Sequence, residues 1–235
     1  MQHTSGADES GRAPPELSDL VRHKFEAFTY PPIDLDRRAI RLFRLHCAAE
    51  TEVLSGDLFD AYFEDRENMI PFEALSYTWG GTELTHSLSI NGARLPITYN
   101  LHLALQHVRQ WHQDRYLWID AICINQGNDK ERGHQVAQMG SIYKAAQCVV
   151  CWLGPATDET DAAMEFLQLI QRESLGNDRP RCSRQWAELR SVAQAVDQSN
   201  LRRSQRQGLA ALLQREWFKR VWIIQEVANA QTAQV

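Results

Sequence analysis

The stretch YLWIDAICIN (116–125) is a near-continuous apolar run that contains a single acid, Asp120. Such runs are typical of strands that are covered on both faces, as in parallel sheets. The segment KERGHQVAQMGSIYKAAQ (130–147) then has apolar residues at helical spacing. A second apolar run, CVVCWLGP (148–155), ends in a Gly-Pro pair. The order strand, helix, strand predicts a parallel α/β core with right-handed crossovers.

Upstream segments are predicted to extend this sheet. IRLFRLHC (40–47) and DLFDAYFED (57–65) alternate apolar and polar residues, which indicates strands in an antiparallel part of the sheet. FEALSYTW (72–79) is predicted to be a strand that ends at a glycine pair. SLSINGARLPIT (87–98) contains an Asn-Gly pair between alternating apolar residues, the pattern of a β-hairpin. Asn100 is predicted to cap the helix that follows.

The remaining sequence is predicted to be mainly helical. Helical patterns cover 158–172, 185–197 and 201–214, and a further aromatic-rich helix is expected over 215–230. Together these patterns predict an α/β fold with a mixed, largely parallel sheet and helices on both faces. Extra N-terminal strands and a helical insertion over 158–214 complete it.

Residues 1–38, of which 1–20 are polar, are expected to form a flexible tail and lead-in before an ordered domain over 39–235.

Composition limits the class of protein. The chain has 43% hydrophobic and 23% charged residues, which are globular values. Its net charge of −5 argues against nucleic-acid binding, because that affinity comes from clustered Lys and Arg. No apolar run approaches the roughly 20 residues of a membrane span, and the N-terminus lacks the apolar core of a secretory signal. Five cysteines, an odd number without disulfide spacing, also fit a cytoplasmic protein.

Ligands of open α/β sheets bind at the carboxyl ends of the parallel strands. Three such strand ends can be located in the sequence, at 76–81, 120–126 and 153–155. The first of them ends in the glycine pair Gly80-Gly81. The glycine pair either lets a backbone approach a phosphate closely or forms a tight turn. Asp120, an acid among apolar residues, needs a partner. It either lies in the site or has a structural role, in which it caps a neighbouring loop or pairs with Arg132 or Arg220.

The last predicted helix offers a second candidate. At helical spacing, Trp217, Val221 and Ile224 share one stripe, while Trp222 and Glu226 share another that also contains Phe218 and Asn229. A Trp ring beside a carboxylate could stack a base or nicotinamide while the acid holds a ribose hydroxyl. The alternative is that the aromatic residues are core and that Glu226 pairs with an arginine.

Other reactive side chains are predicted to be structural. Cys148 and Cys151 are three apart in a strand and point to opposite faces, so we expect buried thiols rather than a zinc or redox pair. His102, His107 and His112 are spaced by five and share no helix face. No metal site is expected.

Several blocks, in order along the chain, carry a family resemblance. They are FEALSYTWGG (72–81), LWIDAICINQ (117–126), the Glu131-Arg132 pair followed by Met139 and Tyr143, VVCWLG (149–154) and WFKRVWIIQE (217–226). On these blocks the chain resembles the heterokaryon-incompatibility (HET) domain of filamentous fungi, from about 40 to 230. The resemblance implies a role in non-self recognition and programmed cell death.

The block order is also remotely similar to TIR domains, with a flavodoxin-like core. There the last helix has a Trp-Cys-x-x-Glu pattern, which here reads Trp222 to Glu226 with Ile223 in place of the cysteine. Some TIR domains hydrolyse NAD with that glutamate. The resemblance therefore implies Glu226 as catalytic residue and NAD as substrate, with no cofactor required. The binding residues it implies are Trp222, Trp79, Tyr77, Gly80, Gly81, Asp120 and Asn125.

Two other interpretations stay open. The domain could be a non-catalytic signalling module that self-assembles into a homo-oligomer or binds other HET or signalling-domain proteins. It could also be a truncated, inactive paralogue, because the chain ends soon after the last predicted helix. Loss of Glu226 discriminates between catalysis and scaffolding, since only catalysis depends on this carboxylate.

Overall fold

A computed structural model describes residues 26–49, 52–65, 69–175 and 199–235. The helix predicted over 185–197 lies outside the described residues. Part of the predicted lead-in is described and lies against the sheet. The backbone N–H of Phe28 donates to the carbonyl of Arg94 at 2.9 Å, and that of Arg94 donates to the carbonyl of Glu26 at 2.8 Å.

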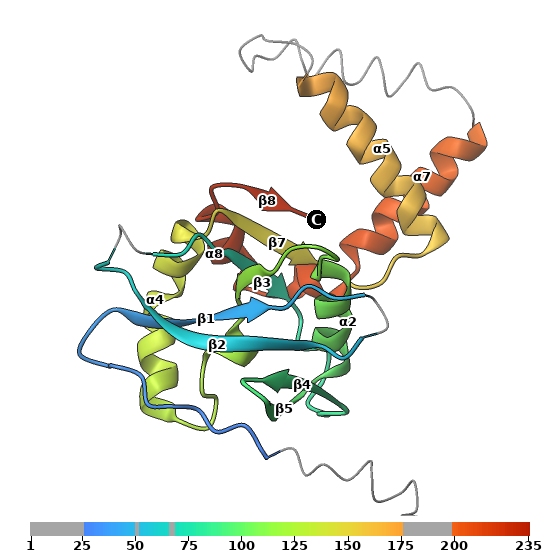
Figure 1. Cartoon of the computed structure of the whole chain (residues 1–235). Coiled ribbons are helices and arrows are strands. Elements are labelled where there is room, and N and C mark those ends of the chain that lie inside the picture. The colour runs from blue at the N-terminus through green and yellow to red at the C-terminus, as the bar shows by residue number, and fades with distance from the viewer. Residues whose placement is uncertain (1–25, 50–51, 66–68, 176–198) are drawn as a thin grey trace, which may run out of the picture.

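The eight strands of the described chain form one sheet in the order β5-β4-β2-β1-β6-β3-β7-β8 (Figure 1). Their bounds are β1 Ala39–Leu45, β2 Ser55–Tyr62, β3 Glu73–Tyr77, β4 His86–Ile90, β5 Ala93–Ile97, β6 Arg115–Trp118, β7 Cys148–Trp152 and β8 Ala233–Gln234. The neighbours β6, β3, β7 and β8 run parallel, whereas β1 is antiparallel to both β2 and β6. The predicted mixed, largely parallel sheet is confirmed.

The predicted hairpin over 87–98 is also confirmed. Strands β4 and β5 pair antiparallel and are joined by Asn91 and Gly92, whose φ angles are 50° and 80°. Positive φ at both central residues is the requirement of a type I′ turn, and Asn-Gly is the pair that adopts it most readily.

Helices cover both faces of the sheet. On one face, Trp118 of β6 packs edge-on against Tyr143 of α4 (Asp129–Ala145), with ring centroids 5.6 Å apart. On the other face, Trp152 of β7 donates from Nε1 to Asn100 Oδ1 of α2 (Tyr99–Val108) at 3.1 Å. The helices on both faces were predicted from the strand-helix alternation alone.

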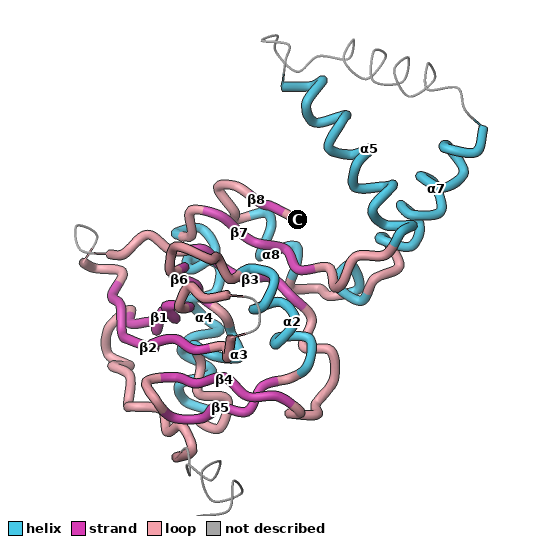
Figure 2. The backbone as a smooth tube through the Cα atoms, turned by 45° about the vertical axis from the view of Figure 1, so that its right-hand side comes forward, coloured by secondary structure: helices cyan, strands magenta, loops and turns pink. Residues whose placement is uncertain are grey.

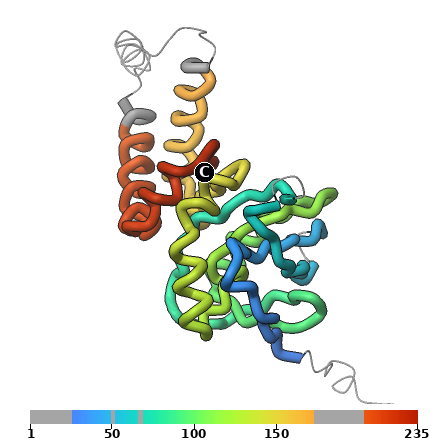
Figure 3. Tube along the Cα trace, turned by 90° about the vertical axis from the view of Figure 1, so that its left-hand side faces the viewer, coloured from blue at the N-terminus to red at the C-terminus, as the bar shows by residue number. Residues whose placement is uncertain are grey.

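The predicted helical insertion contains a helix pair. Helices α5 (Asp158–Leu175) and α7 (Ser199–Leu213) lie against each other and extend away from the sheet (Figures 2 and 3). Gly208 makes their contact possible, because a Cβ atom there would lie 1.9 Å from the carbonyl oxygen of Glu159.

Three local predictions were wrong. The run 116–125 is not one strand: β6 ends at Trp118 and a short helix, α3 (Asp120–Cys123), follows. An apolar run cannot distinguish a buried strand from a strand followed by a buried helical turn. The cap of α2 is Thr98, whose Oγ1 accepts from Leu101 N at 3.4 Å, rather than Asn100.

The third error concerns 215–230, which is not one helix. A 3-10 turn, η1 (Glu216–Lys219), is separated from α8 (Ile223–Ala228) by Arg220, whose backbone is extended. The break disrupts the predicted stripes, because Val221 and Ile224 are 79% and 71% exposed although Trp217 is buried.

Candidate functional site

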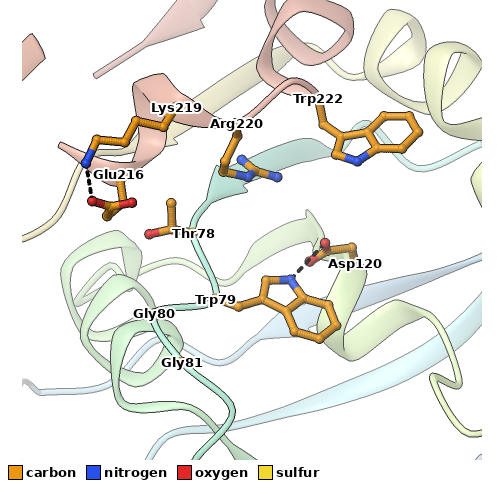
Figure 4. A pocket seen from close by; sticks show the side chains of 9 residues that line it. All are labelled: Thr78, Trp79, Gly80, Gly81, Asp120, Glu216, Lys219, Arg220 and Trp222. Atoms are coloured by element: carbon orange, nitrogen blue, oxygen red, sulfur yellow. Dashed lines mark hydrogen bonds and ion pairs between the residues drawn. The ribbon is translucent and has the colours of Figure 1, made fainter. Parts of the chain in front are cut away.

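An open cleft of about 730 Å³ lies at the carboxyl end of β3, as expected for an α/β sheet (Figure 4). One wall is the loop after β3, with Thr78, Trp79 and the glycine pair. The opposite wall is the η1–α8 segment, with Lys219, Arg220 and Trp222. Segments separated by about 140 residues in the sequence therefore meet across the cleft.

The glycine pair forms a turn that only glycine adopts without strain. Gly80 and Gly81 have φ angles of 73° and 120°. A Cβ atom on Gly80 would lie 2.7 Å from the Cβ of Asn100, so the loop also approaches α2 closely. Asn100 stabilises this close contact between the loop and α2, because its Nδ2 donates to the carbonyl of Thr78 at 2.6 Å. The same glycine geometry leaves open space beside Gly81, where a Cβ would meet no atom within 4 Å.

Two carboxylates line the cleft: Glu216, which pairs with Lys219 at 2.5 Å, and Asp120, which pairs with no cation of the described residues. The Oδ2 of Asp120 accepts from Trp79 Nε1 at 3.1 Å and its Oδ1 from Ala121 N at 2.7 Å (Figure 4). Burial raises the pKa of Asp120, although both hydrogen bonds and the charge of Arg220 act in the opposite direction. Neither predicted ion pair forms: Arg132 pairs with Asp129 at 2.7 Å, and Arg220 pairs with another acid. Asp120 instead fixes the Trp79 indole.

Glu226 lies beneath the cleft and has no solvent exposure. Arg220 donates to both of its carboxylate oxygens, at 2.9 and 3.2 Å. The hydroxyl of Ser76 donates to Oε2 as well, and Trp217 Nε1 donates to that hydroxyl at 2.8 Å. Of the two alternatives for Glu226, the structure therefore contains the arginine pair. Arg220 remains 22% exposed and reaches the cleft from above the buried carboxylate.

Phe218 and Trp222 are not core residues, contrary to the alternative interpretation of their stripe, whereas Trp217 is buried in the core. Trp222 is 50% exposed and Trp79 is 43% exposed, and both line the cleft. Phe218 is exposed by about a third as well. Large exposed indoles at the wall of a cleft are available to stack on a planar ligand.

Tyr77 and Asn125 do not line this cleft. They line a second, more apolar pocket of about 350 Å³, which shares Trp79 and Gly81 with it. Tyr77 is buried, and desolvation together with the nearby Asp120 charge raises the pKa of its hydroxyl. The predicted binding residues are thus divided: Trp79, Trp222, Gly80, Gly81 and Asp120 meet in the cleft, and Tyr77 and Asn125 lie in the adjoining pocket.

Sequence reasoning missed the cationic groups of the cleft. Arg220 and Lys219 lie in the family block WFKRVWIIQE but were not assigned to the site. The signal was present, because a buried Glu226 requires a donor and Arg220 lies six residues away. Ser76, the other donor to Glu226, had no signal in the sequence.

The cysteine pair of β7 is buried, as predicted. Cys148 and Cys151 are 8% and 4% exposed, and desolvation raises the pKa of the Cys151 thiol to about 12. Such thiols are unreactive at neutral pH. Within the described ranges, no three His, Cys, Asp or Glu side chains are placed to hold a metal ion. None of the helices in the same ranges has the length and apolar content needed to cross a bilayer.

The fold and the cleft define an α/β domain with a candidate ligand site at the carboxyl edge of its sheet. Comparison with known sequences identifies the family of this domain. The family described as "Heterokaryon incompatibility protein (HET)" matches residues 72–226. The chain belongs to this family. It is 31% identical over 229 residues to "Heterokaryon incompatibility protein 6, OR allele" of Neurospora crassa. That match covers 85% of this chain and 33% of the relative, so the chain spans about a third of the relative's length. No solved structure matches the chain.

Proposed function

We propose that this chain acts in fungal heterokaryon incompatibility, as a cytoplasmic domain that triggers programmed cell death by hydrolysing NAD. The family and the name of the Neurospora relative support the biological setting. The observation that carries the chemical part is the cleft, in which two exposed tryptophans, two cationic side chains and two carboxylates, Asp120 and Glu216, converge.

Each component of the cleft matches a part of a pyridine dinucleotide. The indoles of Trp79 and Trp222 offer surfaces for a planar ring. Arg220 and Lys219 would supply donors for a pyrophosphate, Lys219 by exchanging its ion pair with Glu216 and Arg220 through the N–H groups that do not bond to Glu226. The glycine turn leaves room for it beside Gly81.

Hydrolysis would break the bond between the nicotinamide nitrogen and C1′ of the ribose. Nicotinamide leaves with the bonding electron pair, water adds to C1′, and one proton is released with ADP-ribose. The ribose passes through an oxocarbenium-like state, which a nearby carboxylate stabilises, as in glycoside hydrolysis.

Two carboxylates could serve this step, and the geometry separates them. Asp120 lines the cleft and is available in the present conformation. Glu226, the residue implied by the TIR similarity, is enclosed by Arg220 and Ser76, so it could reach a ribose only after Arg220 moves. In the conformation described, Glu226 acts on the cleft by orienting Arg220.

A second candidate function is a non-catalytic signalling module. The enclosed Glu226 carboxylate favours it, as do Val221 and Ile224, apolar residues that are largely exposed beside Trp222. Exposed apolar side chains next to one another are a feature of protein interaction sites. The partner would be a second copy of the chain or another HET or signalling-domain protein.

NAD concentration over time, measured with purified protein at high concentration, separates these functions. The variants are Asp120→Asn and Glu226→Gln, and the matched control is Glu165→Gln on the exposed face of α5. Loss of NAD with wild type and control that is abolished by Asp120→Asn or by Glu226→Gln supports hydrolysis, and a loss of activity in only one of the two variants identifies the carboxylate that the reaction needs. Stable NAD in every sample, with toxicity retained in cells, would contradict hydrolysis and favour the signalling module.

A further inference from the structure

The apolar pocket beside the cleft has no role in the hydrolytic chemistry just described. It is lined by side chains from four separate parts of the chain: Tyr30 before β1, Leu84 in the loop after β3, Pro96 in β5, and Leu101 in α2. Its volume of about 350 Å³ and its mainly apolar wall fall within the range of small-molecule sites.

Trp79 and Gly81 belong to the walls of both the pocket and the cleft. The indole of Trp79 is held in place by its hydrogen bond to Asp120. A Cβ atom on Gly81 would meet no atom within 4 Å, so there is open space beside this shared residue. A ligand with two ends can therefore occupy both.

The two cavities differ in chemistry, and this difference orients such a ligand. The cleft contains four charged side chains, two basic and two acidic (Arg220, Lys219, Asp120 and Glu216), whereas aromatic and aliphatic side chains dominate the pocket. If the proposed function holds, the scissile bond and its cationic nicotinamide ring must lie beside a carboxylate, hence in the cleft. The other ring of the dinucleotide is neutral adenine, which an apolar pocket accommodates at lower desolvation cost.

One edge of the pocket is polar and could form hydrogen bonds with an adenine ring. Asn125 accepts a hydrogen bond from Gly127 N through Oδ1 at 3.1 Å, which leaves the two N–H groups of its side chain for a ligand. Ring nitrogens of adenine are acceptors for donors of this kind. Gln126 lies beside Asn125, but its Nε2 already donates to the carbonyl of Asp120 at 2.9 Å.

We propose that this pocket is an adenosine subsite, which holds the adenine end of the dinucleotide while its pyrophosphate passes over Gly81 into the cleft. The inference rests on the proposed function for the identity of the whole ligand. Its own test needs only adenosine.

The experiment is calorimetric binding of adenosine to the full chain. Ala121 lines the pocket and is half-buried, so Ala121→Phe fills the cavity from its wall. Asn125→Ala removes the polar edge without adding volume, and it remains informative if the larger substitution impairs folding. Ala210→Phe, at an exposed position of α7, is the matched control.

We expect adenosine to bind wild type and the control equally, at least tenfold more weakly to Ala121→Phe, and about fivefold more weakly to Asn125→Ala. The inference is overturned if wild type shows no saturable binding of adenosine, or if both pocket variants bind adenosine with the affinity of wild type. Either result would stand even if NAD were hydrolysed. Adenosine binding that follows the expected order without NAD hydrolysis would leave the subsite in place and remove the proposed reaction instead.

Discussion

Arg220→Met should destabilise the fold, because it leaves the Glu226 carboxylate buried without its cation. Glu226 has no exposure and accepts two hydrogen bonds from Arg220. Breaking a buried pair by removing one partner typically costs about 3–5 kcal/mol. Arg220 is 22% exposed and Ser76 still donates to Glu226, so the lower end, about 3 kcal/mol, is expected.

Replacing both partners tests the cause. Arg220→Met combined with Glu226→Leu removes the unpaired charge, so the double variant should be more stable than Arg220→Met alone by about 1–2 kcal/mol. Full recovery is not expected, because the Ser76 hydroxyl loses its acceptor.

Urea unfolding followed by circular dichroism measures these differences. With a slope of about 3 kcal/mol per molar urea, Arg220→Met should lower the midpoint by about 1 M. Arg203→Met, an exposed arginine on α7, is the control and should leave the midpoint unchanged. The reasoning is refuted if Arg220→Met unfolds at the wild-type midpoint, or if the double variant is less stable than the single one.

Three further perturbations follow from the structure. Burial raises the pKa of Asp120 above its unfolded value, so ionised Asp120 disfavours the folded state. Asp120→Asn should match wild type near pH 3.5 and become progressively more stable than it as the pH rises; a constant difference in urea midpoint across that range would contradict this. Glu131→Gln removes the carboxylate that holds the buried Arg41 at 2.5 and 3.2 Å and leaves it with the more distant Asp60 at 3.7 Å, so it should cost about 3 kcal/mol by the same assay, whereas an unchanged midpoint would refute the pair's role. Gly208→Ala forces a Cβ to within 1.9 Å of the carbonyl of Glu159, so α5 and α7 must separate at a cost of about 1–3 kcal/mol; equal protease resistance of this helix pair in variant and wild type would argue against the contact.

The elements that sequence patterns predicted are those fixed by local periodicity, by short apolar runs or by turn chemistry. Strands β1, β2, β4 and β5 and the long helices α4 and α5 follow from period-2 or period-3.6 patterns, β3 and β7 follow from apolar runs that end at glycine, and the hairpin follows from Asn91-Gly92. The sheet order could not be predicted. Strand β1 lies between β2 and β6 in an antiparallel arrangement, and no local pattern specifies which edge a strand joins.

The error that bears most on the site arose where tertiary contacts override helix periodicity. The segment 215–230 has helical spacing throughout, yet Arg220 adopts an extended backbone and its side chain bonds to Glu226. The break exposes Trp222 to the cleft and buries Glu226 beneath it, so one continuous helix would have misplaced both. The grouping of Trp79, Asp120 and the glycine pair could be predicted, because strand ends of a parallel sheet meet at one edge.

Direct binding of NAD to wild type and to Trp222→Ala tests the central claim, that the cleft between the two indoles is a dinucleotide site. Trp222 is half exposed, so its loss should leave the fold intact, and Trp111→Ala removes an indole that is 65% exposed outside the cleft. Stacking on an aromatic side chain contributes about 1–3 kcal/mol per base, so we expect an affinity loss of roughly 5- to 150-fold in Trp222→Ala and none in Trp111→Ala. Equal affinities of the three proteins for NAD, or no binding by any of them, would contradict the account.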